Sequence, residues 1–182
     1  IMVLDGGPCD VGIESTIVDL SRWDTHGPVV LRPGAISQQM LNDALSKAEV
    51  IVPKLADESA NHSAPRVSGS LSAHYAPKTK MFLYEKEQLE DLLKSHTKPD
   101  SKIAWVHFND ESWTFQQLGS YALTEIVLPD SAQLLAQQLY ALLRQLDQSS
   151  YDLIAFEHLP KGEAWDAIRD RLGRAAVGSG II

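Results

Sequence analysis

The sequence is poor in cysteine and in basic residues. A single cysteine, Cys9, cannot form an internal disulfide, which is typical of a protein made for a reducing compartment. The 24 acidic residues outnumber the 16 lysines and arginines and give a net charge of −8, whereas nucleic-acid binding requires clustered basic side chains. Arg169, Arg171 and Arg174 do cluster, but they alternate with acids on a predicted helix, as on a solvated surface. We therefore expect no direct, stable binding of nucleic acid.

Long apolar runs are absent as well. None approaches the length of about 18 residues that a membrane span requires, and no basic segment followed by an apolar one is visible as a leader. We therefore expect a soluble, cytoplasmic protein that does not bind a membrane. No two of the six histidines lie at metal-ligand spacing with a third donor, so we predict no metal site. No histidine near Cys9 in sequence could activate it, and no catalytic nucleophile is predicted.

A glycine-rich segment lies between two predicted strands, residues 2–4 and 15–20. Its three glycines fall within seven positions: Gly6, Gly7 and Gly12. Glycine permits positive φ and lets a ligand approach the backbone, although glycine-rich turns between strands are more often purely structural. The segment is not a phosphate loop, because Ile13-Glu14 stands where that motif requires lysine followed by serine or threonine.

Hydroxyl groups and an arginine follow this segment. Ser15 and Thr16 stand at the beginning of the second strand, and Arg32 ends the next strand just before Pro33-Gly34. A guanidinium group binds two oxygens of a phosphate or carboxylate at once, so this set predicts a pocket for a small anion. The alternative is an ordinary surface arginine in a salt bridge. Ser15 lacks the context of a nucleophile elbow and is not expected to attack a substrate.

Two sequence motifs support a resemblance to a known family. Residues 6–20 read G-G-P-C-D-V-G-I-E-S-T-I-V-D-L and residues 30–36 read V-L-R-P-G-A-I. This pattern resembles the end of the YrdC-like domain of threonylcarbamoyl-AMP synthases. Residues 69–77, G-S-L-S-A-H-Y-A-P, resemble the linker of the two-domain members, which reads roughly S-P-G-M-x-Y-x-H-Y-x-P. Serines replace the proline, methionine and tyrosine of that linker at Ser68, Ser70 and Ser72.

The resemblance implies three parts: the C-terminal portion of a YrdC-like α/β domain in residues 1–52, an interdomain linker or lid in residues 53–80, and a Rossmann-like domain in residues 81–182. Ile1 is not an initiator and lies inside an apolar strand, so we expect a C-terminal fragment. The K-x-R and S-x-N elements that the family uses on ATP have no counterpart here. From residue 54 to 80 the composition is that of a linker, and His74-Tyr75 favours a lid over a plain tether.

The last hundred residues alternate between two patterns. Short apolar runs predict strands at 81–84, 103–106, 125–128 and 153–156, and amphipathic segments predict helices at 87–95, 131–148 and 163–176. A further helix is predicted at 37–46 and a short strand at 49–52. The alternation predicts a small Rossmann-like three-layer α/β/α domain with a mainly parallel sheet. Residues 85–88 after its first strand lack a glycine fingerprint, so we expect no dinucleotide. The aromatic segment 107–115 lines a groove or forms a surface loop.

The resemblance also implies a function. Such enzymes are nucleotidyltransferases that join L-threonine, bicarbonate and ATP, as its magnesium complex, into threonylcarbamoyl-adenylate and pyrophosphate. No permanently bound cofactor is implied, and other proteins later transfer the group to adenosine in tRNA. By matched position, Ser15 and Thr16 contribute to the threonine and carbamate side, and Arg32 binds the nucleotide phosphate. The linker residues Gly69, His74 and Tyr75 form the lid.

Two alternatives remain open. The piece could be a non-catalytic regulatory or interaction module that binds a nucleotide or a small anion. A carbamoyltransferase-associated YrdC-like module is disfavoured by the linker and the extra domain. We expect the isolated fragment to be inactive and to homodimerise through the partly uncovered sheet of residues 1–52.

Overall fold

A computed structural model of the chain describes residues 2, 4–7, 9–48, 65, 67–69, 75–109 and 121–180. Its largest unit is a four-stranded, fully parallel sheet. The strands are β3 (Met81–Tyr84), β4 (Lys102–Phe108), β5 (Ala122–Leu128) and β6 (Leu153–Glu157). They are ordered β3-β6-β4-β5, so the last strand in sequence lies between the first and the second of this unit.

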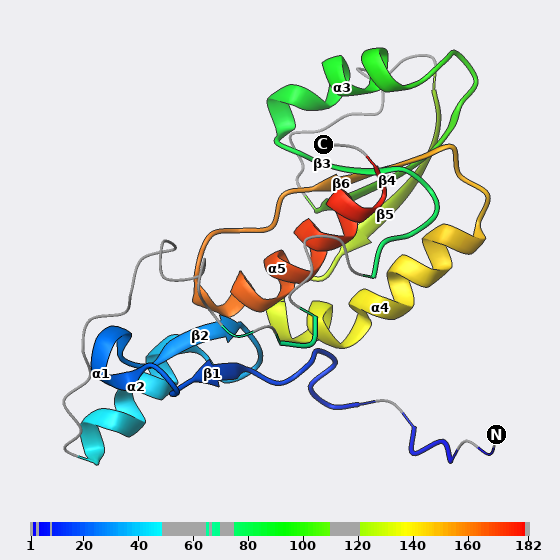
Figure 1. The fold of residues 1–182 in the computed structure, drawn as a ribbon. Helices are drawn as coiled ribbons and strands as arrows, with labels where there is room; N and C mark the ends of the chain where they lie inside the picture. Colours follow the sequence, from blue (N-terminus) through cyan, green and yellow to red (C-terminus); the bar gives the residue numbers. More distant parts are fainter. Residues whose placement is uncertain are drawn as a thin grey trace.

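Helices cover both faces of the sheet (Figure 1). One face packs against α3 (Leu89–His96), which follows the short 3-10 helix η2 (Lys86–Gln88) and buries Leu89 and Leu93. The other face packs against α4 (Ala132–Gln148) and α5 (Glu163–Gly178). Successive strand residues alternate between the two apolar cores, as the pleat of a strand requires. The predicted three-layer α/β/α class with a parallel sheet is confirmed.

Local sequence signals explain where the helices begin. The Ser131 hydroxyl accepts a hydrogen bond from the amide of Leu134 and caps α4, and Ser37 caps α2 (Gln38–Lys47) through the amide of Met40. The buried leucines of α4 recur at helical spacing: Leu135, Leu139, Leu143 and Leu146. At the other end of the domain, the Ser179 hydroxyl donates to the carbonyl of Met81 and accepts from its amide, each at 3.0 Å, which fastens the end of α5 to β3.

The N-terminal part contains a second, smaller sheet. Strands β1 (Ile17–Asp19) and β2 (Val29–Arg32) pair antiparallel around the one-turn helix α1 (Trp23–His26). The Asp19 carboxylate closes the connection by accepting from the Ser21 amide at 2.9 Å and from Arg22 Nε at 2.8 Å. The Ser21 hydroxyl also donates to this carboxylate, at 2.6 Å. The bonds from the Ser21 hydroxyl, Arg22 and the Ser21 amide outweigh a smaller opposing effect of desolvation and lower the pKa of Asp19 to about 2.

Two expectations for this part are corrected. Met2 and Leu4 do not belong to a strand and are almost fully exposed, because a strand forms only beside a partner and the described residues provide none there. The second strand is also shorter than residues 15–20, because pairing with β2 extends only over Ile17–Asp19. The strand predicted at 49–52 and most of the linker lie outside the described residues.

No helix in the described ranges is both long enough and apolar enough to span a membrane.

Candidate functional site

Arg32 brings three predicted site residues together. It is 8% exposed at the end of β2, and its Nε donates a hydrogen bond to the carbonyl oxygen of Ser15 at 3.1 Å. Its Nη1 donates to the carbonyl oxygen of Ser68 at 3.0 Å, directly before Gly69. A Cβ on Gly69 would lie only 3.2 Å from Nη1, and the φ of Gly69 is +76°, so glycine suits this contact on both counts.

The hydrogen-bond partners of the Arg32 guanidinium are neutral oxygens. Within the part of the chain that the structure describes, no carboxylate forms an ion pair with this guanidinium. Its partners are the Ser15 and Ser68 carbonyls and, at 3.5 Å, the Ser68 hydroxyl. A buried cation without an anionic partner favours the approach of an anion.

Thr16 ties the beginning of β1 to the turn after β2. Its hydroxyl donates to the Ile36 carbonyl at 2.7 Å and accepts from the Ile36 amide at 3.2 Å. The turn can approach this closely because Gly34 has no side chain: a Cβ there would lie 2.3 Å from the Thr16 nitrogen. Thr16 therefore supports the site through the backbone, whereas the Ser15 side chain beside it is exposed.

The glycine-rich segment packs against helix α4. Gly12 has a φ of +81°, and a Cβ on it would lie 2.2 Å from the Cα of Gln137 and 2.4 Å from the carbonyl oxygen of Ala136. The Gln137 side chain in turn donates a hydrogen bond to the Asp10 carbonyl. The glycine at this position thus serves helix packing, which is the structural alternative that the sequence left open.

Glu14 is the centre of a polar cluster that joins the first and last parts of the chain. Its Oε2 accepts hydrogen bonds from the Tyr140 hydroxyl of α4 at 2.6 Å and from Nε of Arg171 of α5 at 2.9 Å. Tyr75, from the predicted lid, also hydrogen-bonds to the Glu14 carboxylate. We call Glu14, Tyr75, Tyr140 and Arg171 the Glu14 cluster. Because Glu14 precedes Ser15, the cluster lies next to the Arg32 contacts.

The surroundings of Glu14 keep its carboxylate ionised. Desolvation raises the pKa of Glu14, but the hydrogen bonds from Tyr140, Tyr75 and Arg171 together outweigh it and lower the pKa to about 2. Burial and its hydrogen bond to Glu14 raise the pKa of Tyr140. The pKa of Tyr75 is raised by its own hydrogen bond to Glu14 and, to a smaller extent, by burial. For Arg171, desolvation is outweighed by the contacts with Glu14 and Asp170, so its pKa is raised.

Tyr75 is anchored against α4. Its ring centroid lies 4.9 Å from that of Tyr140, with the planes tilted by 45°. Its φ of +57° is unusual for a residue with a large side chain, and such a conformation costs roughly 1–2 kcal/mol. The contacts with Tyr140 and Glu14 offset that cost. His74, the other predicted lid residue of this pair, lies outside the described residues.

A cavity of about 360 Å³ adjoins the docked glycine segment. It lies between that segment, the turn at Gly34 and the first turns of α4 and α5, where Glu163 accepts a hydrogen bond from the Gln39 amide. Its walls include Asp10, Ser37, Gln133 and Glu163 among apolar side chains. Arg32 does not line it, so the cavity belongs to the joint between the N-terminal part and the parallel sheet domain.

Sequence reasoning missed most of the Glu14 cluster and misjudged one member. Arg171 was expected on a solvated face, but it is 1% exposed. One signal could have indicated this: Arg171 falls on the same helical stripe as the buried Ala167, Ile168 and Ala175. An arginine on an apolar stripe needs an acidic partner, and Glu14 supplies it through the fold.

Fold and site together define a parallel α/β domain with a glycine-rich segment packed against its helix α4. Next to this segment, Arg32 contacts the linker at Ser68. Residues 36–177 match the family model described as threonylcarbamoyl-AMP synthase, C-terminal domain. The chain therefore belongs to this family.

Relatives and solved structures agree with the family assignment. The chain is 25% identical to the threonylcarbamoyl-AMP synthase of Pyrococcus abyssi and 29% identical to that of Schizosaccharomyces pombe, in each case over 96% of this chain but only 48% and 45% of the relative. The Bacillus subtilis synthase is 28% identical over 97% of this chain and 49% of its own length. The chain thus spans about half the length of these relatives.

The same fold is found in crystals of P. abyssi Sua5 complexed with L-threonine, with a TM-score of 0.69 and 22% identity. That match covers 96% of this chain and 49% of the other. A second structure, of a P. abyssi Sua5 variant in which alanines replace a histidine and the tyrosine after it, has a TM-score of 0.60.

Proposed function

We propose that the chain is the C-terminal part of an L-threonylcarbamoyladenylate synthase. The whole enzyme is a nucleotidyltransferase that forms threonylcarbamoyl-AMP and pyrophosphate from L-threonine, bicarbonate and magnesium-bound ATP, without a permanently bound cofactor. The observation that carries the proposal is the convergence of Ser15, Arg32 and Gly69, which come from two motifs distant in sequence. The family membership and the named relatives support it.

Each side chain has a role that its surroundings support. Arg32, buried among neutral oxygens, attracts the nucleotide phosphate. Ser15 faces the threonine and carbamate side, and Thr16 holds the adjoining turn in place through Ile36. None of these groups attacks the substrate. The rate comes from holding a labile carbamate against the α-phosphate and from stabilising the charge that develops there.

The linker acts as a lid over this site. Gly69 borders Arg32, which bonds to the Ser15 carbonyl, and Tyr75 is anchored to Tyr140 and to Glu14, the residue before Ser15. His74-Tyr75 is the only place in the sequence where a tyrosine follows a histidine. A histidine and the tyrosine after it are the pair replaced in the P. abyssi Sua5 variant. This coincidence supports His74 as the third lid residue.

The proposal includes an organisation of the whole protein. Residues 1–52 complete a YrdC-like domain that precedes them in the longer enzyme, residues 53–80 form the linker, and residues 81–182 form the Rossmann-like domain. The enzyme is cytoplasmic, and its product passes to the proteins that transfer the threonylcarbamoyl group to tRNA. Alone, the chain is inactive and pairs with a second copy through the partly uncovered region of residues 1–52. Two large apolar side chains there are more than half exposed: Leu20, directly after β1, and Met40, on α2.

Pyrophosphate release from ATP tests the assignment. In the full-length enzyme, release that depends on threonine and bicarbonate is expected, and Arg32→Ala is expected to lower it by about a hundredfold, as the loss of a charged group at a transition state does. Arg169→Ala, at a partly exposed position of α5 that contacts none of the proposed substrate-binding residues, is the matched control and leaves the rate unchanged. If Arg32→Ala is fully active, the alternative of a non-catalytic regulatory or interaction module gains instead.

A further inference from the structure

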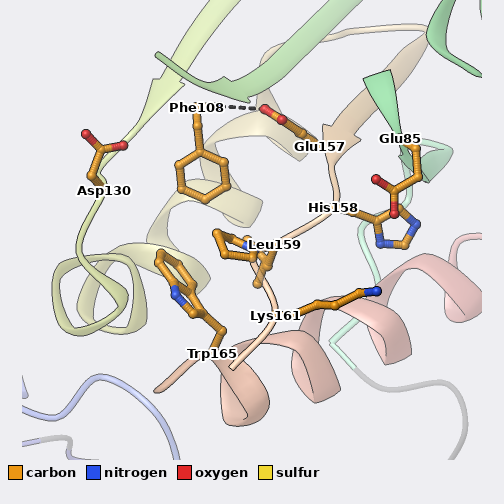
Figure 2. A pocket seen from close by; sticks show the side chains of 9 residues that line it. Glu85, Phe108, Asp130, Glu157, His158, Leu159, Lys161 and Trp165 are labelled. Carbon is orange, nitrogen blue, oxygen red and sulfur yellow. Dashed lines mark hydrogen bonds between the residues drawn. The ribbon is translucent and has the colours of Figure 1, made fainter. Parts of the chain in front are cut away.

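A second cavity, of about 440 Å³, lies at the carboxyl ends of the parallel strands. Figure 2 shows it from close by. Its walls come from the ends of four strands and from the beginning of α5, and they include Glu85, Phe108, Asp130, Glu157, Lys161 and Trp165. Neither Arg32 nor any other residue proposed above to bind substrate lines it. It is therefore distinct from the site of the proposed synthase reaction.

The topology of the sheet creates this cavity. Strands β3 and β6 are parallel neighbours, but the chain leaves β3 toward α3 on one face and leaves β6 toward α5 on the opposite face. The two connections diverge directly after Glu85 and Glu157, so a crevice opens between them (Figure 2). In open α/β sheets, ligands bind at such a switch point outside the carboxyl ends of the strands.

One wall of the cavity is aromatic and held in place. The rings of Phe108 and Trp165 meet edge to face, with centroids 5.6 Å apart and planes at 88°. Both rings pack partly against the core between the sheet and helices α4 and α5, while a part of each remains uncovered. Aromatic faces of this kind bind apolar groups and also attract cations through the ring quadrupole.

The rim carries an excess of negative charge. Glu85, Asp130 and Glu157 supply three carboxylates from three different strand ends, against the single ammonium of Lys161. The amide of Phe108 donates to Glu157 Oε2 at 2.7 Å and fixes that carboxylate beside the aromatic wall. Across the described ranges, no three acidic, histidine or cysteine side chains are close enough to hold a metal ion. The charge therefore suits an organic cation better than a metal or a phosphate.

We propose that this crevice binds a small organic cation, an ammonium group joined to an apolar or aromatic body. The body contacts Phe108 and Trp165, and the ammonium group lies among the carboxylates of the rim. Because Glu85 and Asp130 are exposed, the ligand enters from solvent without any movement of the sheet. The Rossmann-like domain thus has a ligand of its own, whatever the first domain catalyses.

A matched pair of probes tests the proposal on the chain itself. Phenethylammonium chloride carries the charge and the ring, and 2-phenylethanol has the same ring and chain length without the charge. In amide-resolved NMR titrations, phenethylammonium is expected to shift the amides of Phe108, His158 and Trp165 and to bind about fivefold more tightly than the alcohol at low salt, with the difference shrinking at high salt. Equal affinity for the two probes, shifts elsewhere, or no shifts would overturn the proposal.

Paired variants localise the effect. Glu85→Gln with Asp130→Asn removes two exposed rim charges and should weaken phenethylammonium binding by about fivefold while leaving 2-phenylethanol binding unchanged. Glu90→Gln with Asp91→Asn makes the same chemical changes in the first turn of α3, away from the crevice, and should have no effect. Identical losses in both double variants would mean that general surface charge, not this crevice, attracts the cation, and the proposal would fail.

Discussion

Arg171 and Glu14 lie 157 positions apart in sequence, yet Nε of the arginine is 2.9 Å from Oε2 of the glutamate. Arg171 is almost completely buried in the core-facing side of α5, and Glu14 belongs to the segment that leads into Ser15. The bond therefore connects the interior of the parallel sheet domain with the proposed substrate site. Whatever fixes Glu14 also fixes where Ser15 meets Arg32.

Replacing Glu14 by glutamine should destabilise the chain by about 2 kcal/mol, because the amide keeps an oxygen acceptor but loses the charge that strengthens the bonds from Arg171 and Tyr140. Urea unfolding followed by circular dichroism measures the loss. Glu90→Gln, which removes an exposed partner of Lys94 on α3, is the control and should leave the midpoint nearly unchanged. Equal midpoints for Glu14→Gln and wild type would show that the cluster contributes no stability.

The same carboxylate predicts a pH dependence. The folded pKa of Glu14, about 2, lies below its ordinary value of 4.5, so the unfolded chain takes up the proton first as pH falls. Its contribution to stability is therefore complete above about pH 4.5 and is lost as pH falls toward 2. Urea unfolding of wild type and Glu14→Gln at several pH values should show curves that differ at pH 6 and converge near pH 2. A difference that stays constant over this range would contradict the low pKa.

Gly12 should tolerate no side chain. An alanine there would need a positive φ and would bring its Cβ to 2.2 Å from the Gln137 backbone, so the segment has to leave α4. We expect Gly12→Ala to cost roughly 2 kcal/mol in the free energy of unfolding.

Gly173 provides the matched control for that substitution. It lies within α5, and no atom would meet an added Cβ within 4 Å. Gly173→Ala should therefore stabilise the chain by about 0.5–1 kcal/mol, because alanine favours the helix. If both alanine variants shift the unfolding midpoint in the same direction, steric contact with α4 does not determine the effect.

A buried hydrogen bond between two aromatic side chains gives a fourth prediction. Trp105 Nε1 donates to the Tyr84 hydroxyl at 2.8 Å in the core beneath α3. Tyr84→Phe removes the acceptor and should cost about 1–2 kcal/mol in unfolding free energy. Tyr151→Phe, at a half-buried position next to β6, removes a hydroxyl with no hydrogen bond to any described residue and should be nearly neutral. Equal stabilities of the two variants would argue against the bond.

Secondary structure in the parallel domain could be predicted wherever apolar residues dominate. Strand β3 was predicted with its observed bounds, Met81–Tyr84, and α4 to within one residue. Strand β5 was predicted three residues too short, because the polar and exposed Thr124 interrupts the apolar run at the beginning of the strand. It lies at the edge of the sheet, where one strand neighbour suffices and polar side chains are tolerated. The apolar pattern therefore marked only the buried end of this strand.

The candidate site was predictable only where neighbouring residues define it. Thr16 directly precedes β1, and Arg32 ends the paired strand β2, which is close in sequence. The resemblance of the linker motif selected Gly69. The contacts of Glu14 with Tyr140 and Arg171 could not be predicted, because no local pattern relates residues 126 and 157 positions apart. Such contacts depend on how the whole domain folds around them.

The position of β6 has a consequence for the order in which the chain can fold during synthesis. Of the four parallel strands, β3 and β4 emerge from the ribosome first, but they are not neighbours, and Leu153–Glu157 lies between them in the sheet. Until that segment emerges, β3 has no partner in the sheet, and the polar groups along its edge remain open to water and to other nascent chains. The ligand crevice between β3 and β6, like the bond between Arg171 and Glu14, can therefore form only after nearly all of these residues have been translated.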